Sequence, residues 1–506
     1  MHAAAKTSGV RRVRPAPCDA DAALASSGTV AATLHDAPTV TAPLFDRFLS
    51  TPEILEVFEA RPFVQAMFDF EAALARAEAA EGVIPDAAAA KVASACRVEA
   101  YDLDSLVSTG ANAGSLAIPL VKRLTEAVAA QDAAAAAWVH WGSTSQDVLD
   151  TAMAICTRRA LGLFDGALDR LTTGALDLAE RHLETPVLGR TLLQPAQVVS
   201  FGFKVLAWAA PLVRGRARLQ RAAGEALQLQ LGGAVGTLAT LGDKGPAVAR
   251  RMVADLGLGF APGAWHTQRD AWVALGCEVG VLCGSLGKIA TDIALLAQGE
   301  VGEVAEPAGA GRGGSSAMPH KRNPVAAMVA RAAALRTPQR VAALLAAMAQ
   351  EHERGLGNWQ AELAEWPGLW ISAHGAASAL ADAVGGLEVD ADRMRANIEA
   401  LRGLVFAEGL AGTLALRLGK SRAHEMVERL SKRVVSEGRS LRELALEAVA
   451  ADPALRSSVP PAAVEAVFDT AAAARRAAAA ARPQLQALRA AHVGRALNAA
   501  NERSSA

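Results

Sequence analysis

Long stretches with helical apolar periodicity constrain the fold of this chain most strongly. They lie at residues 147–184, 194–232, 268–305 and 324–352. Within the third stretch, apolar residues recur at alternating spacings of three and four, at Val279, Leu282, Leu286, Ile289, Ile293 and Leu296. Long helices pack side by side at shallow angles along an a/d seam of this kind. The pattern therefore predicts a central bundle of long helices.

The composition agrees with an all-α fold. Apolar residues make up 52% of the 506 residues and aromatic residues only 4%, and a chain rich in alanine and leucine favours close-packed helices over sheets. Shorter helices with frequent turn residues are expected on both sides of the bundle. We predict a disordered extension at residues 1–43, an N-terminal helical domain at 44–140, the central bundle at 141–398 and a C-terminal helical domain at 399–506.

Charge and cysteine content exclude several kinds of partner. The 51 basic and 52 acidic residues nearly cancel, so we expect no nucleic acid and no membrane surface as partner. The arginines of a helix expected at 470–499 are interpreted as a solvated face. The longest apolar stretch, Ala271 to Leu286, contains Glu278 and is too short to span a bilayer comfortably. The five cysteines lack zinc-site spacing, and no signal peptide is apparent, so a cytoplasmic protein without a metal is predicted.

A glycine-rich cationic loop is expected at residues 308–324, ahead of the fourth long stretch. Pro319 prevents a helix through it, and Asn323 followed by Pro324 is typical of an N-cap and a first helical residue. The loop carries no acidic residue, and its polar side chains are Ser315, Ser316, His320, Lys321, Arg322 and Asn323. Such a loop suits the binding of a small polyanion, although an exposed linker is also commonly rich in glycine and serine.

A second candidate site precedes the first long stretch. Gly142 is followed by Ser143, Thr144 and Ser145, which would present hydroxyl groups and free helix N–H groups to an anion. A simple capping cluster would have the same residues.

The residues from Gly314 to Pro324 resemble the signature G-S-S-x-M-P-x-K-x-N of the fumarase/aspartase superfamily. Other short blocks are similar to adenylosuccinate lyases and, more often, to bacterial 3-carboxy-cis,cis-muconate cycloisomerases. These blocks are 70–75, 117–122, 140–147, 189–191, 266–270 and 350–354. The resemblance implies a lyase that needs no organic cofactor, acts on a small dicarboxylate or tricarboxylate, and assembles as a homotetramer through the long helices.

The resemblance also implies roles for individual residues. Ser315 would be the general base, with Ser316 as the alternative, while Lys321 and Asn323 would hold the loop and the carboxylate that accumulates charge. Residues expected to bind the substrate are Thr144, Ser145, Gln146, His140, Arg190, Thr191, His266, Arg269 and Ser316. Arg354 and His352 are weaker candidates, because a charged helix end would look the same.

Several positions depart from the relatives. No histidine follows Gly189-Arg190-Thr191, Ser115-Leu116 replaces an expected asparagine-serine pair, and Gln360 replaces an expected histidine. Without a histidine acid, the enzyme best suits a leaving group that is stable as an anion. Two reactions meet this condition. We favour C–N cleavage of nitrosuccinate to fumarate and nitrite, and the alternative is 3-carboxy-cis,cis-muconate cycloisomerisation in aromatic-acid catabolism.

Overall fold

The computed structural model describes residues 43–309, 313–314, 318 and 320–504. Residues 40–506 form one compact unit. Helices dominate the described residues, so the all-α fold class is confirmed. The domain boundaries at 140/141 and 398/399 stay predictions, and the predicted disorder of 1–43 falls almost wholly outside the described residues.

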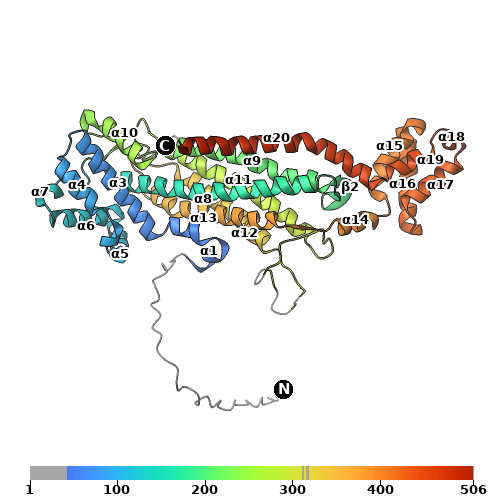
Figure 1. Cartoon of the computed structure of the whole chain (residues 1–506), viewed down its shortest axis with the longest axis horizontal. Helices are drawn as coiled ribbons and strands as arrows, with labels where there is room; N and C mark the ends of the chain where they lie inside the picture. Colours follow the sequence, from blue (N-terminus) through green and yellow to red (C-terminus); the bar gives the residue numbers. More distant parts are fainter. Residues whose placement is uncertain (1–42, 310–312, 315–317, 319, 505–506) are drawn as a thin grey trace, which may run out of the picture. The chain divides into compact units, whose positions relative to one another are not determined.

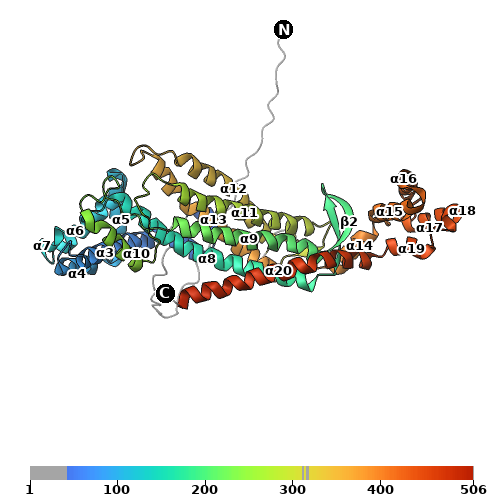
Figure 2. The same cartoon turned by 90° about the horizontal axis from the view of Figure 1, so that it is seen from above.

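Five long helices form the central bundle. They are α8 (Ser145–Arg181), α9 (Phe201–Ala226), α11 (Asp270–Leu296), α12 (Val325–Ala347) and α13 (Asn358–Gly385). Figures 1 and 2 both show them side by side, with α11 against α9, α12 and α13. All six seam residues predicted in α11 are buried. The predicted a/d seam of α11 is therefore confirmed as a buried helix face.

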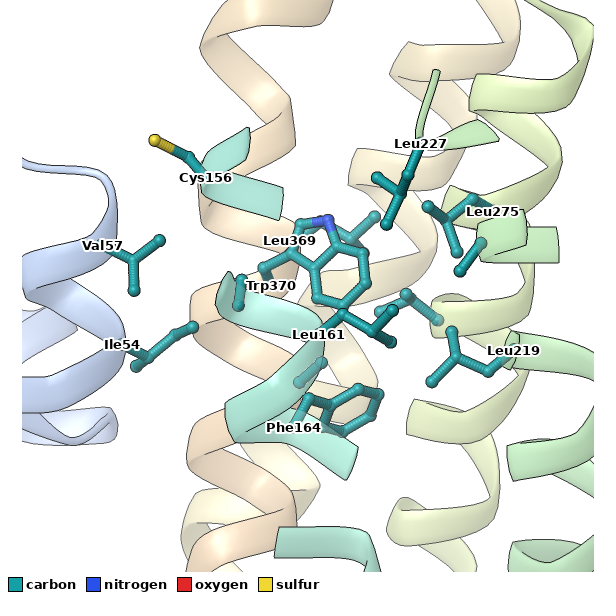
Figure 3. Close-up of a cluster of buried hydrophobic side chains, with 14 of the residues drawn as sticks. Ile54, Val57, Cys156, Leu161, Phe164, Leu219, Leu227, Leu275, Leu369 and Trp370 are labelled. Carbon is teal, nitrogen blue, oxygen red and sulfur yellow. The ribbon is translucent and has the colours of Figure 1, made fainter. Parts of the chain in front are cut away.

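Large apolar side chains fill the space between these helices. Figure 3 shows Trp370 of α13 beside Phe164 of α8, and their rings meet edge-on with centroids 6.2 Å apart. Ile54 of α2 (Pro52–Val57) reaches the same cluster from the N-terminal helices. The bundle and the N-terminal helices consequently share one continuous core.

The helix α11 is longer than the apolar stretch from Ala271 to Leu286 that was noted in the sequence. Among the described helices, it is the one with the length and composition to cross a membrane. Core helices of soluble proteins pass the same test, and the seam of α11 is buried against its neighbours. The cytoplasmic location stays a prediction.

The shorter α-helices before α11 are α1 (Leu44–Leu49), α2, α3 (Ala60–Ala80), α4 (Asp86–Ala95), α5 (Leu103–Ala113), α6 (Ala117–Ala129), α7 (Ala133–Ala136) and α10 (Gly245–Leu256). They pack against one another and, through α1, α2, α3 and α6, against α8 and α13. At the start of α2, Thr51 is the N-cap residue and Pro52 the first helical residue, a position at which proline is common. Helix α3 packs against α8, α4 and α10. It thereby brings its buried face to the beginning of the long bundle.

The C-terminal helices are α14 (Ala391–Glu399), α15 (Ala407–Leu418), α16 (Lys420–Glu437), α17 (Leu441–Ala451), α18 (Pro453–Arg456), α19 (Pro461–Val467) and α20 (Thr470–Ser504). Helices α15 to α19 form a core of their own, whereas the buried residues of α14 and α20 belong to the main core or to a separate small cluster. Helix α20 returns along α9 and α8. Arg489 of α20 donates to Asp177 and Glu180 of α8, so the predicted solvated arginine face is in part a docking face within the chain.

A hairpin replaces the expected start of the second long helix. Strands β1 (Pro186–Thr191) and β2 (Gln194–Ser200) pair antiparallel, and Ser200 then caps α9 by accepting from the N–H of Phe203. Leu192 and Leu193 form the turn with φ of 51° and 65°. Neither glycine nor asparagine stands at this turn, so the hairpin has no recognisable signal in the sequence. A second short pair joins β3 (Val304–Ala305) to β4 (Glu388–Val389).

Helix α12 begins one residue later than the sequence indicated. Its N-cap is Pro324 and its first residue is Val325, so the prediction of Asn323 as N-cap was wrong. The carboxylate of Glu306 accepts from the N–H groups of Ala326 and Ala327. A side chain distant in sequence therefore satisfies the donors that the predicted cap would have served.

Candidate active site

The first turn of α8 is the centre of the candidate site. Thr144 is the N-cap residue, and its backbone N–H donates to the carboxylate of Asp147 at 3.0 Å. Ser145 begins the helix and is partly exposed. Since N–H groups of a first turn have no acceptor within the helix, this end of α8 can receive an anion.

His140 lies just before this turn and contacts a buried carboxylate. Its Nδ1 is 2.6 Å from Oε1 of Glu71, a fully buried residue of α3, and 2.8 Å from Oγ of Ser143. Burial lowers the pKa of His140, but the charge and hydrogen bond of Glu71, with a further contribution from Asp147, leave that pKa above its usual value. The imidazole is thereby favoured as a cation at the mouth of the site.

A second cation reaches Thr144 from the segment between α12 and α13. Nη2 of Arg354 donates to Oγ1 of Thr144 at 2.9 Å. Nε of Arg354 and both polar side-chain atoms of Gln350 are buried, and each lacks a hydrogen-bond partner among the described residues. Unpaired buried donors are costly. They indicate a place where a ligand completes the hydrogen bonding.

Beneath the first turn lies a buried polar network. Nε2 of His266 is 2.7 Å from Oδ1 of Asp147, and the amide nitrogen of Gln146 donates to the carbonyl of His266 at 2.9 Å. His266 and Gln146 are both buried. These contacts fix the turn from below. The substrate-binding roles assigned to Gln146 and His266 stay predictions.

Arg269 joins three elements from within this network. Its guanidinium donates to Asp150 of α8 at 2.9 Å and to Glu362 of α13, and it stacks over the ring of Trp265 at 4.5 Å. The side chain is almost completely buried. Because its donors already meet carboxylates of its own chain, the contacts favour a structural role. The expected carboxylate clamp at Arg269 stays a prediction.

Arg190 and Thr191 lie at the other end of α8, in the hairpin. Arg190 forms a two-fold hydrogen bond with the buried carboxylate of Glu303, at 2.9 and 2.7 Å, while Thr191 is exposed beside the turn. The 37 residues of α8 span about 55 Å. Within one chain, these two residues are therefore not brought together with Thr144.

The described part of the glycine-rich loop precedes α12. The backbone N–H of Asn323 donates to the carbonyl of Gly313 at 2.9 Å, which closes the base of the loop. Gly313 has φ of +64°, and a Cβ there would lie 2.7 Å from the Asn323 carbonyl oxygen. The guanidinium of Arg322 donates to the carboxylate of Glu388, and this contact also anchors the end of the loop. Ser315 and Ser316 lie outside the described residues.

Lys321 and Asn323 are also separated from the first turn of α8. Lys321 is exposed and stands just before α12, whereas Arg354 follows its far end. The 23 residues of α12 span about 34 Å. One chain thus presents three groups of predicted site residues, around Thr144, around Arg190 and around Lys321, and it does not assemble them into one pocket.

An uncharged pocket adjoins the first group. It has a volume of about 450 Å³, and it lies between the α5–α6 junction, α8 and the start of α13. Three of the positions that depart from the family pattern meet here, because Ser115, Leu116 and Gln360 all line it, whereas the run after Thr191 does not. Two features of this region were not found from the sequence. They are the partner of His140, Glu71, whose only signal is an acidic residue within an apolar run, and the contact of Arg354 with Thr144.

The described residues contain no group of three histidine, cysteine, aspartate or glutamate side chains placed to hold a metal ion. The histidines of the site instead pair one to one with carboxylates, as His140 does with Glu71 and His266 with Asp147. Both contacts hold an imidazole in a fixed orientation, with one ring nitrogen occupied.

Comparison with known proteins gives a consistent result. Residues 47–338 match a protein family described as lyase. A 3-carboxy-cis,cis-muconate cycloisomerase of Bradyrhizobium diazoefficiens is 47% identical over 421 residues, which are 83% of this chain and 92% of that protein. A nitrosuccinate lyase of Streptomyces davaonensis is 43% identical over 390 residues, 76% of this chain and 82% of that protein. The crystal structure of the 3-carboxy-cis,cis-muconate lactonizing enzyme from Pseudomonas putida covers 88% of this chain and 99% of its own, with 40% identity and a TM-score of 0.82.

Proposed function

This chain belongs to the fumarase/aspartase superfamily of lyases, and we propose that it catalyses anti β-elimination from a substituted succinate. The preferred reaction is C–N cleavage of nitrosuccinate to fumarate and nitrite. One observation carries this proposal. Positively charged side chains at the first turn of α8 can bind an anion, and an uncharged pocket lies beside them.

The anion site supports a carboxylate substrate. His140 and Arg354 bring positive charge to Thr144, and the first turn of α8 adds N–H donors. A succinate carboxylate placed there would pair the Nε donor of Arg354, which lacks a hydrogen-bond partner among the described residues.

The pocket supports a substrate with two carboxylates over one with three. None of the described residues that line it carries a charge. A third carboxylate pushed into the pocket would lose water without gaining a cation, and that costs several kcal/mol. A nitro group has no net charge and avoids this cost.

The elimination needs a base and a leaving group. We assign the base to Ser315, which removes the proton from C3, while Lys321 and Asn323 stabilise the negative charge that develops on the neighbouring carboxylate. The C–N bond then breaks, and its electron pair leaves with nitrite. Nitrite needs no proton donor, which agrees with the run Leu192, Leu193, Gln194 and Pro195 after Thr191, where the family resemblance leads one to expect a histidine close by.

Assembly into a homotetramer is part of the proposal. In one chain, Lys321 precedes α12, whereas Arg354, which contacts Thr144, follows its far end, so a complete site requires residues of another copy. The bundle also exposes large apolar side chains on α11 and α12. They are Val281, Leu295, Met328, Leu335 and Leu345. Such a surface is typical of helices that associate.

The test measures nitrite and fumarate release from nitrosuccinate, with the Ser315→Ala variant as control. Stoichiometric release that the variant loses supports the proposal. The second candidate is cycloisomerisation, which the high identity to the Bradyrhizobium cycloisomerase favours. Lactone formation from 3-carboxy-cis,cis-muconate, without nitrite release from nitrosuccinate, would establish that alternative and reject C–N cleavage.

A further inference from the structure

The uncharged pocket beside the α8 turn has more room than a nitro group needs. Its volume is about 450 Å³, within the range typical of small-molecule sites. Most of its lining is apolar, and the side chains that shape it include Phe58, Phe63, Leu116, Leu149, Met153 and Leu363.

We infer that this pocket binds an apolar arm on the group that leaves from C2 of the substrate. The inference rests on the proposed function, because it places the succinate carboxylate at Thr144. It extends the substrate class to 2-substituted succinates whose leaving group departs as a stable anion and carries an apolar arm, with nitrosuccinate as the smallest member, which has no arm.

The pocket and the anion site share two elements. Leu149 and Met153 follow Ser145 by four and eight residues on α8, so they lie on the same face of the helix. Side chains on a helix lean toward its N-terminus, which brings Leu149 toward the turn of Ser145. On the other wall, Trp359 and Gln360 follow Arg354 closely in sequence. One ligand can therefore reach both places.

The chemistry of the lining defines the arm. The described lining residues have no charge to pair with an ionic group, so burial of apolar surface is the available source of affinity. Besides the amide of Gln360, Ser115 contributes a hydroxyl whose Oγ is buried and has no hydrogen-bond partner among the described residues. An arm with an apolar body and a single acceptor or donor would satisfy that hydroxyl.

The experiment compares succinate with 2-benzylsuccinate by calorimetry on the full-length protein. The wild type should bind 2-benzylsuccinate roughly ten to a hundred times more tightly than succinate, because the phenyl ring is removed from water. In Ala111→Trp, an indole on the exposed wall of the pocket should abolish this difference and leave succinate affinity unchanged. Thr109→Trp is the matched control, since Thr109 is exposed on the opposite side of α5 and does not line the pocket.

Each outcome decides the inference. Loss of the benzyl advantage in Ala111→Trp alone supports it. If succinate binds but the benzyl arm brings no gain, the inference fails and the proposed function stands. If Ala111→Trp changes the oligomeric mass while the two affinities stay in proportion, a second copy of the chain covers the pocket and the inference is also overturned. If neither compound binds, both proposals fail.

Discussion

Glu71 lies directly behind His140, with its Oε1 2.6 Å from the imidazole Nδ1, and it is completely shielded from solvent. The other oxygen of Glu71 has no hydrogen-bond partner among the described residues. A carboxylate buried in this way is held for its effect on the imidazole, because it gains little else from its surroundings.

Glu71→Gln should lower the pKa of His140. Burial alone would depress that pKa, and the variant removes the charge that reverses the effect. Since an anion is bound best by the protonated imidazole, fumarate affinity should fall with rising pH, and in Glu71→Gln this fall should begin at lower pH. Calorimetric titration with fumarate between pH 5 and 8 measures the shift. Groups that face His140 are Glu71, Ser143 and Asp147, and only the first is altered.

Glu78→Gln provides the matched control for that experiment. Glu78 lies on the same helix and is fully buried, and neither of its carboxylate oxygens has a hydrogen-bond partner among the described residues. Burial, together with the charge of Glu71, raises the pKa of Glu78 to about 9. The residue is therefore neutral near pH 7, and its replacement should leave the pH profile of fumarate binding in place. An equal shift in both variants would contradict the role given to Glu71.

Glu78→Gln should also stabilise the protein as the pH rises. An unfolded chain releases the proton of Glu78 above its ordinary pKa, whereas the folded chain keeps it until about pH 9, so the free energy of unfolding falls as the pH rises between these values. Glutamine does not titrate. The stability gain of Glu78→Gln should thus grow from pH 5 to pH 8 by about 4 kcal/mol, because the folded chain holds one more proton than the unfolded chain over most of these pH units. Urea denaturation at both pH values tests this, and a gain that does not depend on pH would refute it.

Arg269→Met should destabilise the fold strongly. Removal of the guanidinium leaves Asp150 and Glu362 buried without their cation, and breaking such a network costs about 3–5 kcal/mol. Chemical denaturation measures the loss. Arg340→Met is the comparison, since its pair with Glu365 is partly exposed and should contribute about 1 kcal/mol or less. Similar losses of unfolding free energy in the two variants would show that the buried network of Arg269 contributes no more than a partly exposed ion pair.

Two inactive variants should restore activity when their chains are mixed. Ser315 precedes α12 in the sequence and Arg354 follows it. Ser315→Ala and Arg354→Ala should each lower kcat/KM by about a hundred-fold or more. If a site draws on more than one chain, refolding the two variants together produces some sites with neither change. Recovery of part of the wild-type rate is expected. Failure to recover, despite normal assembly, would mean that the two residues act in the same chain.

The long helices were predictable because their signal is local. The seam from Val279 to Leu296 repeats often enough to identify a buried face, and burial of all six residues confirms it. The hairpin at 186–200 lacked such a signal, since its turn is formed by Leu192 and Leu193 where asparagine and glycine are usual. The start of α12 was misplaced because its cap comes from Glu306, which periodicity does not reveal.

The candidate site was predictable only in part. Thr144, Ser145 and His140 are neighbours in sequence and remain together in the structure, so a local motif located them. The partners of these residues come from far away in the chain, with Glu71 on α3 and Arg354 after α12. A single sequence does not encode such pairings visibly. The pocket at Ser115, Leu116 and Gln360 likewise exists only once distant segments have packed.

The burial of Arg269 has a practical consequence for anyone who studies this enzyme by mutagenesis. The residue stands in a signature block, and a scan of that block would record a loss of turnover on its replacement. That loss would report a collapsed scaffold, because the guanidinium links α8 to α13 and stacks on Trp265. Thermal melting or circular dichroism has to accompany every assay of such a variant. Without these measurements, a residue that stabilises the fold would be mistaken for a catalytic residue.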